Sequence, residues 1–446
     1  MSKQLLAGAA KIDITPPVGV DLCGFGGREG HSVGIHDPLM AGALYLDGTA
    51  LPGAASGAVL IITCDLIGLD RAAVADIREL VTASTGLPGD RVMIGCSHTH
   101  SGPSTHCLPT LGVPDDAYLA VLKRKLAGLA KMALDCARPC RLGTLREPVS
   151  VGINRREMRQ GALVLGLNPT GTSAPYVDVV AVDTVEGEPL ARYFVHAAHA
   201  VTLGGDNLQI SGDWPGYAQR CLERVYDSGC VAMFGQGCCG NINSDPRGSF
   251  EIAEAQGRIM AGAVLKAAEY ATKEPEVVIG AALEELSLPC QDPPPVADAE
   301  AILAAAEADA ATKGTSYGLK LMYDGIVDWA GRILELSRSG ATGLTVPFEV
   351  QAFRLGNFAV VAMPGEVFVE YALHLDERAP FAQTATMAYA NGNIGYVPTA
   401  AAFPEGGYEV DSAIRFYGDT MIAPASEQLI LAAGEGLLRQ LRPAGT

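Results

Sequence analysis

A strand, a helix and a second strand follow one another near the start of the chain. Residues 59–64 form a continuous apolar run, residues 71–84 carry an amphipathic helical pattern, and residues 92–96 form a second apolar run. A strand–helix–strand unit of this kind implies two parallel strands joined by a right-handed crossover. This unit therefore predicts an α/β architecture.

The same alternation continues along the first half of the chain. We expect a long helix over 116–136, strands over 177–184, 191–195 and 230–234, and a helix over 215–227. Together these elements predict mixed, largely parallel sheets with flanking helices, in which the loops at strand ends carry the active site.

A proline-rich stretch near 288–297 is the strongest interruption of this pattern. It contains three consecutive prolines, which fit neither a helix nor a sheet. Beyond it we expect an alanine-rich helix over 298–313, two strands joined by a turn over 348–362, and a helix over 426–440. We interpret residues 1–446 as a single domain, and an internal boundary at the proline-rich stretch is the alternative.

The charge of the chain argues against polyanionic partners. Its 446 residues include 32 Lys and Arg against 50 Asp and Glu, a formal net charge of −18. We therefore expect neither nucleic acid nor an anionic membrane surface as a partner. The sequence has no apolar window long enough to span a bilayer and no signal-type start, which predicts a cytoplasmic protein. Eleven scattered cysteines indicate buried free thiols rather than a disulfide framework.

Two histidines lie where the 92–96 strand is expected to end. His98 and His100 are two residues apart, so their side chains leave the same face of an extended segment. Imidazole is a common zinc ligand, and open sheets place their chemistry at the carboxyl ends of strands. The pair predicts a metal site in a strand-end loop, with hydrogen-bonded structural histidines as the alternative. A nucleophilic Cys96, beside the pair, is a further alternative.

Two more candidate ligands follow expected strands. His199 comes just beyond the 191–195 strand, and His196, three residues earlier, is an equal candidate on this evidence. Glu366 stands at a Pro-Gly turn after another strand, where it would supply the carboxylate that two neutral imidazoles lack. The alternative for Glu366 is a solvated glutamate at a helix start, where the helix dipole favours it.

These pieces together resemble the metal-dependent catalytic domain of the neutral ceramidase family. The resemblance spans nearly the whole chain, through residues 11–17, 98–103, 154–155, 199, 210–213, 364–366, 396 and 408. It implies Zn²⁺ as the metal, with the ligands His98, His199, Glu366 and Tyr396. It implies three groups on the substrate side, His100, Arg155 and Tyr408. His199 is preferred to His196 because the run from His199 to Ser211 matches the family pattern, as does the twelve-residue spacing of the two tyrosines.

The chain departs from this family in two places. Where ceramidases carry a serine in a Gly-Asp-x-Ser-Pro motif, this chain has Asn243, and Ser244 follows one residue later. The first departure favours attack by metal-activated water over a serine nucleophile, with Asn243 positioning the substrate. The second is that the C-terminal β-sandwich domain of ceramidases is expected to be absent.

The residues and the resemblance predict a zinc-dependent amidohydrolase that cleaves a C–N bond of a small soluble metabolite. Tyr408 and Arg155 would stabilise the oxyanion, and His100 would orient the water or protonate the departing nitrogen. An esterase or lactonase with the same metal site is one alternative, and a non-catalytic protein stabilised by its metal is another. The expected partner is a small-molecule substrate, and assembly into a homo-oligomer is left open.

Overall fold

Two large β-sheets organise the described part of the chain, which comprises residues 3–54, 56–226 and 229–443 of a computed structural model. In spatial order, the strands of the first sheet are β13 (Val231–Gln236), β11 (Pro189–His196), β10 (Tyr176–Thr184), β7 (Arg138–Pro148), β1 (Leu6–Asp13), β3 (Met40–Asp47), β5 (Ala58–Cys64) and β6 (Val92–Cys96). Those of the second are β19 (Gln383–Met387), β17 (Phe358–Ala362), β16 (Thr345–Leu355), β15 (Val278–Pro289) and β4 (Thr49–Ala50).

The mixed α/β class is confirmed, but the expectation of largely parallel pairing needs correction. In the first sheet β5–β6 and β11–β13 are parallel, whereas the other neighbours run antiparallel. A parallel pair needs a crossover connection, and both of these pairs have a helix between their strands. The antiparallel neighbours β1 and β3, β3 and β5, and β7 and β10 are joined without such a helix, whereas β1 and β7 come from distant parts of the chain.

The buried strand β5 shows how the core is divided. Val59 and Ile61 face one apolar cluster, which also contains residues of the second sheet such as Phe353. Leu60 and Ile62 face a second cluster, which contains residues of the helices that cover the first sheet. Because side chains alternate along a strand and both faces are covered, the sequence of β5 is apolar except for the buried Thr63.

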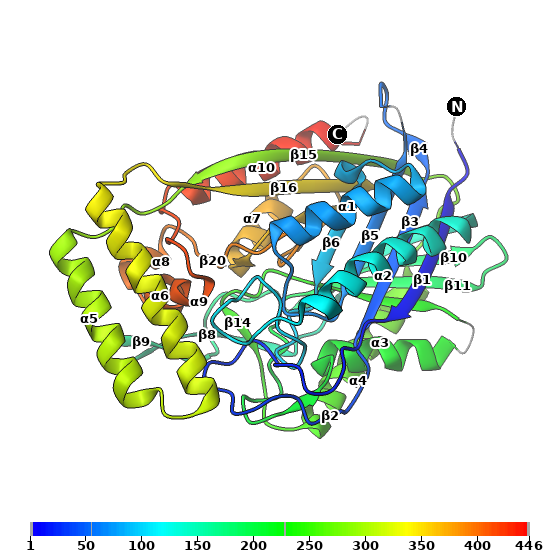
Figure 1. The fold of residues 1–446 in the computed structure, drawn as a ribbon. Coiled ribbons are helices and arrows are strands. Elements are labelled where there is room, and N and C mark those ends of the chain that lie inside the picture. The colour runs from blue at the N-terminus through cyan, green and yellow to red at the C-terminus, as the bar shows by residue number, and fades with distance from the viewer. Residues whose placement is uncertain (1–2, 55, 227–228, 444–446) are drawn as a thin grey trace.

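Most of the longer helices pack over the sheets (Figure 1). The longer ones are α1 (Arg71–Thr85), α2 (Asp116–Asp135), α3 (Asp213–Tyr226), α4 (Phe250–Tyr270), α5 (Val296–Lys313), α6 (Tyr317–Ser339), α7 (Val369–Arg378) and α10 (Ser426–Leu441). Helix α3 begins two residues earlier than expected, and its expected last residue, 227, lies outside the described residues. Within the described ranges, none of the helices is long and apolar enough to cross a membrane.

The helices α5 and α6 form a hairpin inserted between β15 and β16 (yellow and green in Figure 1). The proline-rich stretch connects β15 to this hairpin. Strands β15 and β16 pair antiparallel from Ile279–Leu355 to Pro289–Thr345, so the chain on both sides of the insertion belongs to one sheet. The single-domain interpretation stays a prediction, and this pairing supports it.

Three small sheets and several short helices complete the fold near the ends of the large strands. The small strands are β2 (Gly34–Ile35), β8 (Gly152–Arg159), β9 (Ala162–Asn168), β12 (Gln209–Ile210), β14 (Ile242–Ser244), β18 (Glu366–Val367) and β20 (Tyr396–Val397). The short helices are η1 (Gly89–Arg91), α8 (Ala402–Glu405), the π-helical turn η2 (Tyr408–Ser412) and α9 (Ile414–Tyr417). Several of these segments carry the side chains described next.

Candidate metal centre

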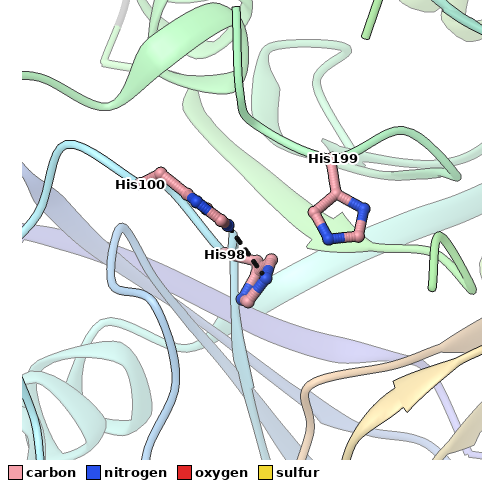
Figure 2. Close-up of side chains that lie close together, drawn as sticks. All are labelled: His98, His100 and His199. Atoms are coloured by element: carbon pink, nitrogen blue, oxygen red, sulfur yellow. Dashed lines mark hydrogen bonds between the residues drawn. The ribbon is translucent and has the colours of Figure 1, made fainter. Parts of the chain in front are cut away.

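Three histidines meet at the ends of two strands. His98 and His100 follow β6, and His199 follows β11. One nitrogen of each ring lies within 4.8 Å of the others, and Figure 2 shows the three side chains approaching one another from two segments. The two strands belong to opposite halves of the first sheet, which share only two residue pairs through β1 and β7.

A segment that follows β19 joins these two halves of the sheet. Ala390 bridges to Gly95 of β6, and Met387 bridges to Gly237, which follows β13. The carboxyl ends of β6, β11 and β19 therefore converge on one region. This is the kind of crevice where open α/β sheets bind ligands.

The backbone around the cluster is held in an unusual conformation. His98 has φ 59° and Tyr389 has φ 51°, which is the left-handed region that residues with a side chain rarely adopt. The His98 N–H donates to Leu66 O at 2.9 Å, and the rings of His98 and Tyr389 stack with centroids 4.0 Å apart. These contacts hold the sharp turn that directs His98 into the cluster.

Backbone carbonyls fix the rings of His98 and His199. His98 Nδ1 lies 2.6 Å from Ile67 O, and His199 Nδ1 lies 2.6 Å from Cys239 O. Because a carbonyl only accepts, each Nδ1 carries the proton and each Nε2 keeps its lone pair. Burial lowers the pKa of His98 to about 3 and also lowers the pKa of His199, so both rings are neutral at pH 7. Metal-binding histidines have this arrangement.

His100 and His196 are held differently. His100 Nε2 lies 3.2 Å from His98 Nε2, but its buried Nδ1 has no hydrogen-bond partner among the described residues. Both nitrogens of His196 face the backbone, with Nδ1 2.7 Å from a carbonyl of β10 and Nε2 3.5 Å from a backbone N–H. The structure thus brings His199, and not His196, to the cluster.

Glu366 places a carboxylate against two of the histidines. Its Oε2 lies 3.0 Å from His199 Nε2 and 3.6 Å from His98 Nε2. Tyr389 donates to the same oxygen at 3.3 Å, and Tyr417 donates to Oε1. Glu366 is therefore a buried member of the cluster and not a solvated residue at a helix start.

The atoms His98 Nε2, His199 Nε2 and Glu366 Oε2 all offer lone pairs to one space. Burial alone would raise the pKa of Glu366, but the polar and charged groups around it, Arg155 among them, lower it to about 2, so the carboxylate is ionised. Three acceptors this close repel one another unless a cation joins them. With bonds of about 2.0–2.1 Å, the ligand atoms of a tetrahedral zinc site stand about 3.3 Å apart, and the two distances to Glu366 are close to this value. The donor set therefore fits a zinc ion.

Arg155, on β8, connects the cluster to two other expected site residues. Its Nη2 donates to Tyr396 Oη at 2.8 Å, and its Nη1 donates to Asn243 Oδ1 at 3.1 Å. The same Nη1 lies 3.4 Å from His199 Nε2. Arg155 also donates to Glu409 at 2.8 Å, which fixes the far side of the guanidinium.

The two tyrosines expected at the site lie next to each other. Glu366 and Tyr396 are partners in the small β18–β20 sheet, so Tyr396 stands beside the carboxylate. The ring of Tyr408 meets that of Tyr396 edge-on, with centroids 5.7 Å apart. Burial raises the pKa of Tyr408 to about 12, so its hydroxyl remains a donor at neutral pH.

Asn243 and Ser244 point to different partners on β14. Asn243 contacts Arg155, whereas the hydroxyl of Ser244 accepts a hydrogen bond from Thr202 at 3.2 Å. Neighbouring residues of a strand project to opposite faces. The structure therefore places Asn243, rather than Ser244, beside the histidine cluster.

Two solved structures share this architecture. Superposition on the neutral ceramidase from Pseudomonas aeruginosa gives a TM-score of 0.71 at 17% identity, and covers 99% of this chain and 75% of that chain. A ceramidase complexed with C2 gives a TM-score of 0.73 at 17% identity, and covers 99% of this chain and 76% of that chain. The chain has a neutral ceramidase-like fold. No protein-family model and no curated protein matches the sequence, so the resemblance is confirmed through the structure.

Within this neutral ceramidase-like fold, several contacts of the site were not predicted. Tyr389 and Tyr417 contact Glu366, and Glu409 contacts Arg155. Only the proximity of Glu409 to Tyr408 in the sequence could have indicated one of them. Cys96 is buried among apolar groups that raise the pKa of its thiol well above the usual value, which argues against the nucleophile alternative.

Proposed function

We propose that the protein is a zinc-dependent hydrolase that cleaves an amide bond of a small molecule. The observation that carries the proposal is the convergence of His98 Nε2, His199 Nε2 and Glu366 Oε2 on one buried space. When bound there, zinc supplies a hydroxide nucleophile at neutral pH and polarises the carbonyl under attack. The likeness to ceramidases supports an amide as the bond that is cleaved.

Three residues hold the metal in this proposal, and Tyr396 is the fourth ligand. His98 and His199 qualify because their Nδ1 protons are committed to carbonyls. Glu366 adds the negative charge, and Tyr389 and Tyr417 fix its carboxylate by hydrogen bonds. Tyr396 qualifies through its pairing with Glu366 on the neighbouring strand.

The remaining polar groups act on the substrate. Arg155 and Tyr408 donate hydrogen bonds to the oxygen that becomes negative during attack on the carbonyl. His100, whose Nδ1 has no partner among the described residues, takes up or releases the proton that reaches the departing nitrogen. Asn243 orients the substrate from the Arg155 side of the site.

Metal analysis combined with an activity screen tests this function. The purified full chain should contain zinc in a one-to-one ratio, and a chelator should abolish hydrolysis of amides until zinc is returned. A metal-free protein with full activity would overturn the proposal. Hydrolysis of esters or lactones alone would favour the esterase alternative, and stoichiometric zinc without any hydrolysis would favour the binding-protein alternative.

A further inference from the structure

Arg28 is a buried cation that lacks a carboxylate partner. Its side chain is only 6% exposed. Nη1 donates to Cys23 O at 3.1 Å and Nη2 donates to His100 O at 2.7 Å, while Nε has no partner among the described residues. Asp206 interacts with it electrostatically but forms no ion pair within 4.0 Å in the described part of the chain. A guanidinium removed from water normally requires such a counter-charge.

Other buried arginines of this chain are compensated. Arg155 and Arg156 pair with Glu409, and Arg192 pairs with Asp183 at 2.7 Å. Among the described residues, Arg354 has no carboxylate partner. It instead donates to the carbonyls of Leu441 and Arg442, at the carboxyl end of α10. A helix carboxyl end carries partial negative charge that favours a cation. Arg28 has neither form of compensation.

Arg28 lies beside His100, the least buried histidine of the cluster. His98 and His199 are each 1% exposed, whereas His100 is only half-buried. The ring of Phe25, also half-buried, stands edge-on to His100 with centroids 5.0 Å apart, and Arg28 Cζ lies 5.2 Å from the Phe25 centroid. A half-buried aromatic ring and a buried cation therefore lie next to His100.

The loop that carries these two residues is fixed from both sides. Gly24, at φ 108°, lies so close to His100 that a Cβ there would stand 2.4 Å from the ring. On the other side, a Cβ at Gly318 of α6 would stand 2.0 Å from the carbonyl oxygen of Arg28. Glycine at both positions permits this close packing. The guanidinium is thus held in place before a ligand arrives, which lowers the entropic cost of binding.

We propose that Arg28 forms a subsite for a carboxylate of the substrate, and that the substrates are N-acyl amino acids whose apolar side chain contacts Phe25. The carboxylate supplies the counter-charge that Arg28 lacks, and a guanidinium is well suited to bind one. The inference rests on the proposed function. In the reaction water adds to the acyl carbon, the C–N bond breaks and a proton goes to nitrogen, which gives a carboxylic acid and an amino acid.

Two matched amides test the subsite with the zinc-loaded full chain. N-acetylphenylalanine and N-acetylphenethylamine share the amide and the phenyl ring and differ by one carboxylate. We expect kcat/KM to be at least about thirtyfold higher for N-acetylphenylalanine, as for a buried charge pair. Arg28→Gln should remove most of this ratio, and Arg28→Lys, which keeps the charge, should retain more of it. Arg220→Gln, which removes a guanidinium paired with Asp37, should leave the ratio unchanged.

An equal loss on both amides in Arg28→Gln would overturn the inference, since it would show that Arg28 only supports the loop around His100. A wild-type ratio near one would also overturn it, while the proposed hydrolase function would stand. Calorimetric binding of phenylalanine and phenethylamine gives a readout independent of turnover. Tighter binding of phenylalanine that depends on Arg28, without hydrolysis of either amide, would support a carboxylate subsite but would refute N-acyl amino acids as the substrates. Equal binding, or no binding, of the two amines would refute the subsite.

Discussion

His199 and His196 lie three residues apart, but they present their rings to different partners. His199 directs Nε2 to Glu366, whereas both nitrogens of His196 face backbone groups. We expect His199→Ala to weaken zinc binding by more than about 100-fold and to abolish turnover, because a ligand is lost. His196→Ala should keep stoichiometric zinc. Elemental analysis of both variants measures this, and the reverse pattern would show that His196 holds the metal.

Tyr396 and Tyr408 are also neighbours with different expected roles. Tyr396→Phe should lower both zinc affinity and rate, since the phenol oxygen is the proposed ligand. Tyr408→Phe should keep the metal and lower kcat by about two to three orders of magnitude with little change in KM, because its hydroxyl is the proposed donor to the developing charge and is not a proposed ligand. Zinc titration and steady-state kinetics separate the two effects. Near-native rates and full zinc in both variants would show that the two tyrosines only hold their loops in place.

Asn243 stands where a serine nucleophile would be expected in a ceramidase. We expect Asn243→Ala to lower turnover and leave measurable hydrolysis, because the proposed attacking group is water. A serine-directed phosphonate should not label the site, since the Ser244 hydroxyl is held by Thr202. Mass spectrometry of the treated protein measures labelling. Stoichiometric modification of Ser244 together with inactivation would instead support a covalent mechanism.

At the scale of elements, the turn η2 is attached to strand β8 by one carboxylate. Glu409 accepts from Arg155 and Arg156, each at 2.8 Å, and all three side chains are buried. Glu409→Gln should lower the free energy of unfolding by about 3–5 kcal/mol, because it removes the carboxylate partner of the buried Arg155 and one of the two carboxylate partners of Arg156. Glu405→Gln is the matched control, since this exposed partner of Arg156 should contribute less than about 1 kcal/mol. Urea denaturation measures both, and equal losses would contradict the argument.

Elements with a regular hydrophobic period could be predicted from the sequence. Strands β5 and β6 and helices α1 and α2 lie within two residues of their expected positions, because their buried faces are continuous. Strand β1 was not predicted, since its alanines and glycine give a weak pattern.

Helix α6 was also not predicted, and its glycines explain why. Gly318 and Gly325 lower the intrinsic helix propensity of this segment. In the structure they allow α6 to lie against Arg28 and Thr110, where a Cβ would collide. Tertiary packing, which the sequence pattern does not display, decides the conformation here.

At the scale of the whole molecule, metal binding should be visible as thermal stability. A ligand present at 100 times its Kd and bound only by the folded state adds about 2.7 kcal/mol. For a chain of this length that corresponds to a rise in Tm of about 3 °C, given the usual unfolding entropy per residue. Calorimetry with zinc and with a chelator measures the shift, and His199→Ala should not show it. An equal rise in Tm in His199→Ala would show that the metal binds at another site.

His98, His199 and Glu366 could be proposed as ligands because each follows a recognisable strand end, whereas Tyr396 was proposed from the family resemblance alone. Several of the groups that hydrogen-bond to these ligands and to His100 could not be predicted. Tyr417, in the short helix α9, and Arg28, in a loop, come from segments without a regular pattern, and α6 packs against both segments. Their positions follow from the assembled fold, in which the two halves of the first sheet and the helical hairpin meet.

The left-handed backbone at His98 and Tyr389 lowers the stability of the chain but is needed for the site. Such a conformation costs a residue with a side chain about 1–2 kcal/mol, and glycine would adopt it without that cost. Glycine, however, would bring no ring to Glu366. Substitutions that relax the strain at these two positions therefore also remove a ring from the cluster. If selection for the site were absent, stabilising substitutions at these positions would be free to accumulate. Lineages that no longer need the reaction should lose the strained residues before they lose the fold.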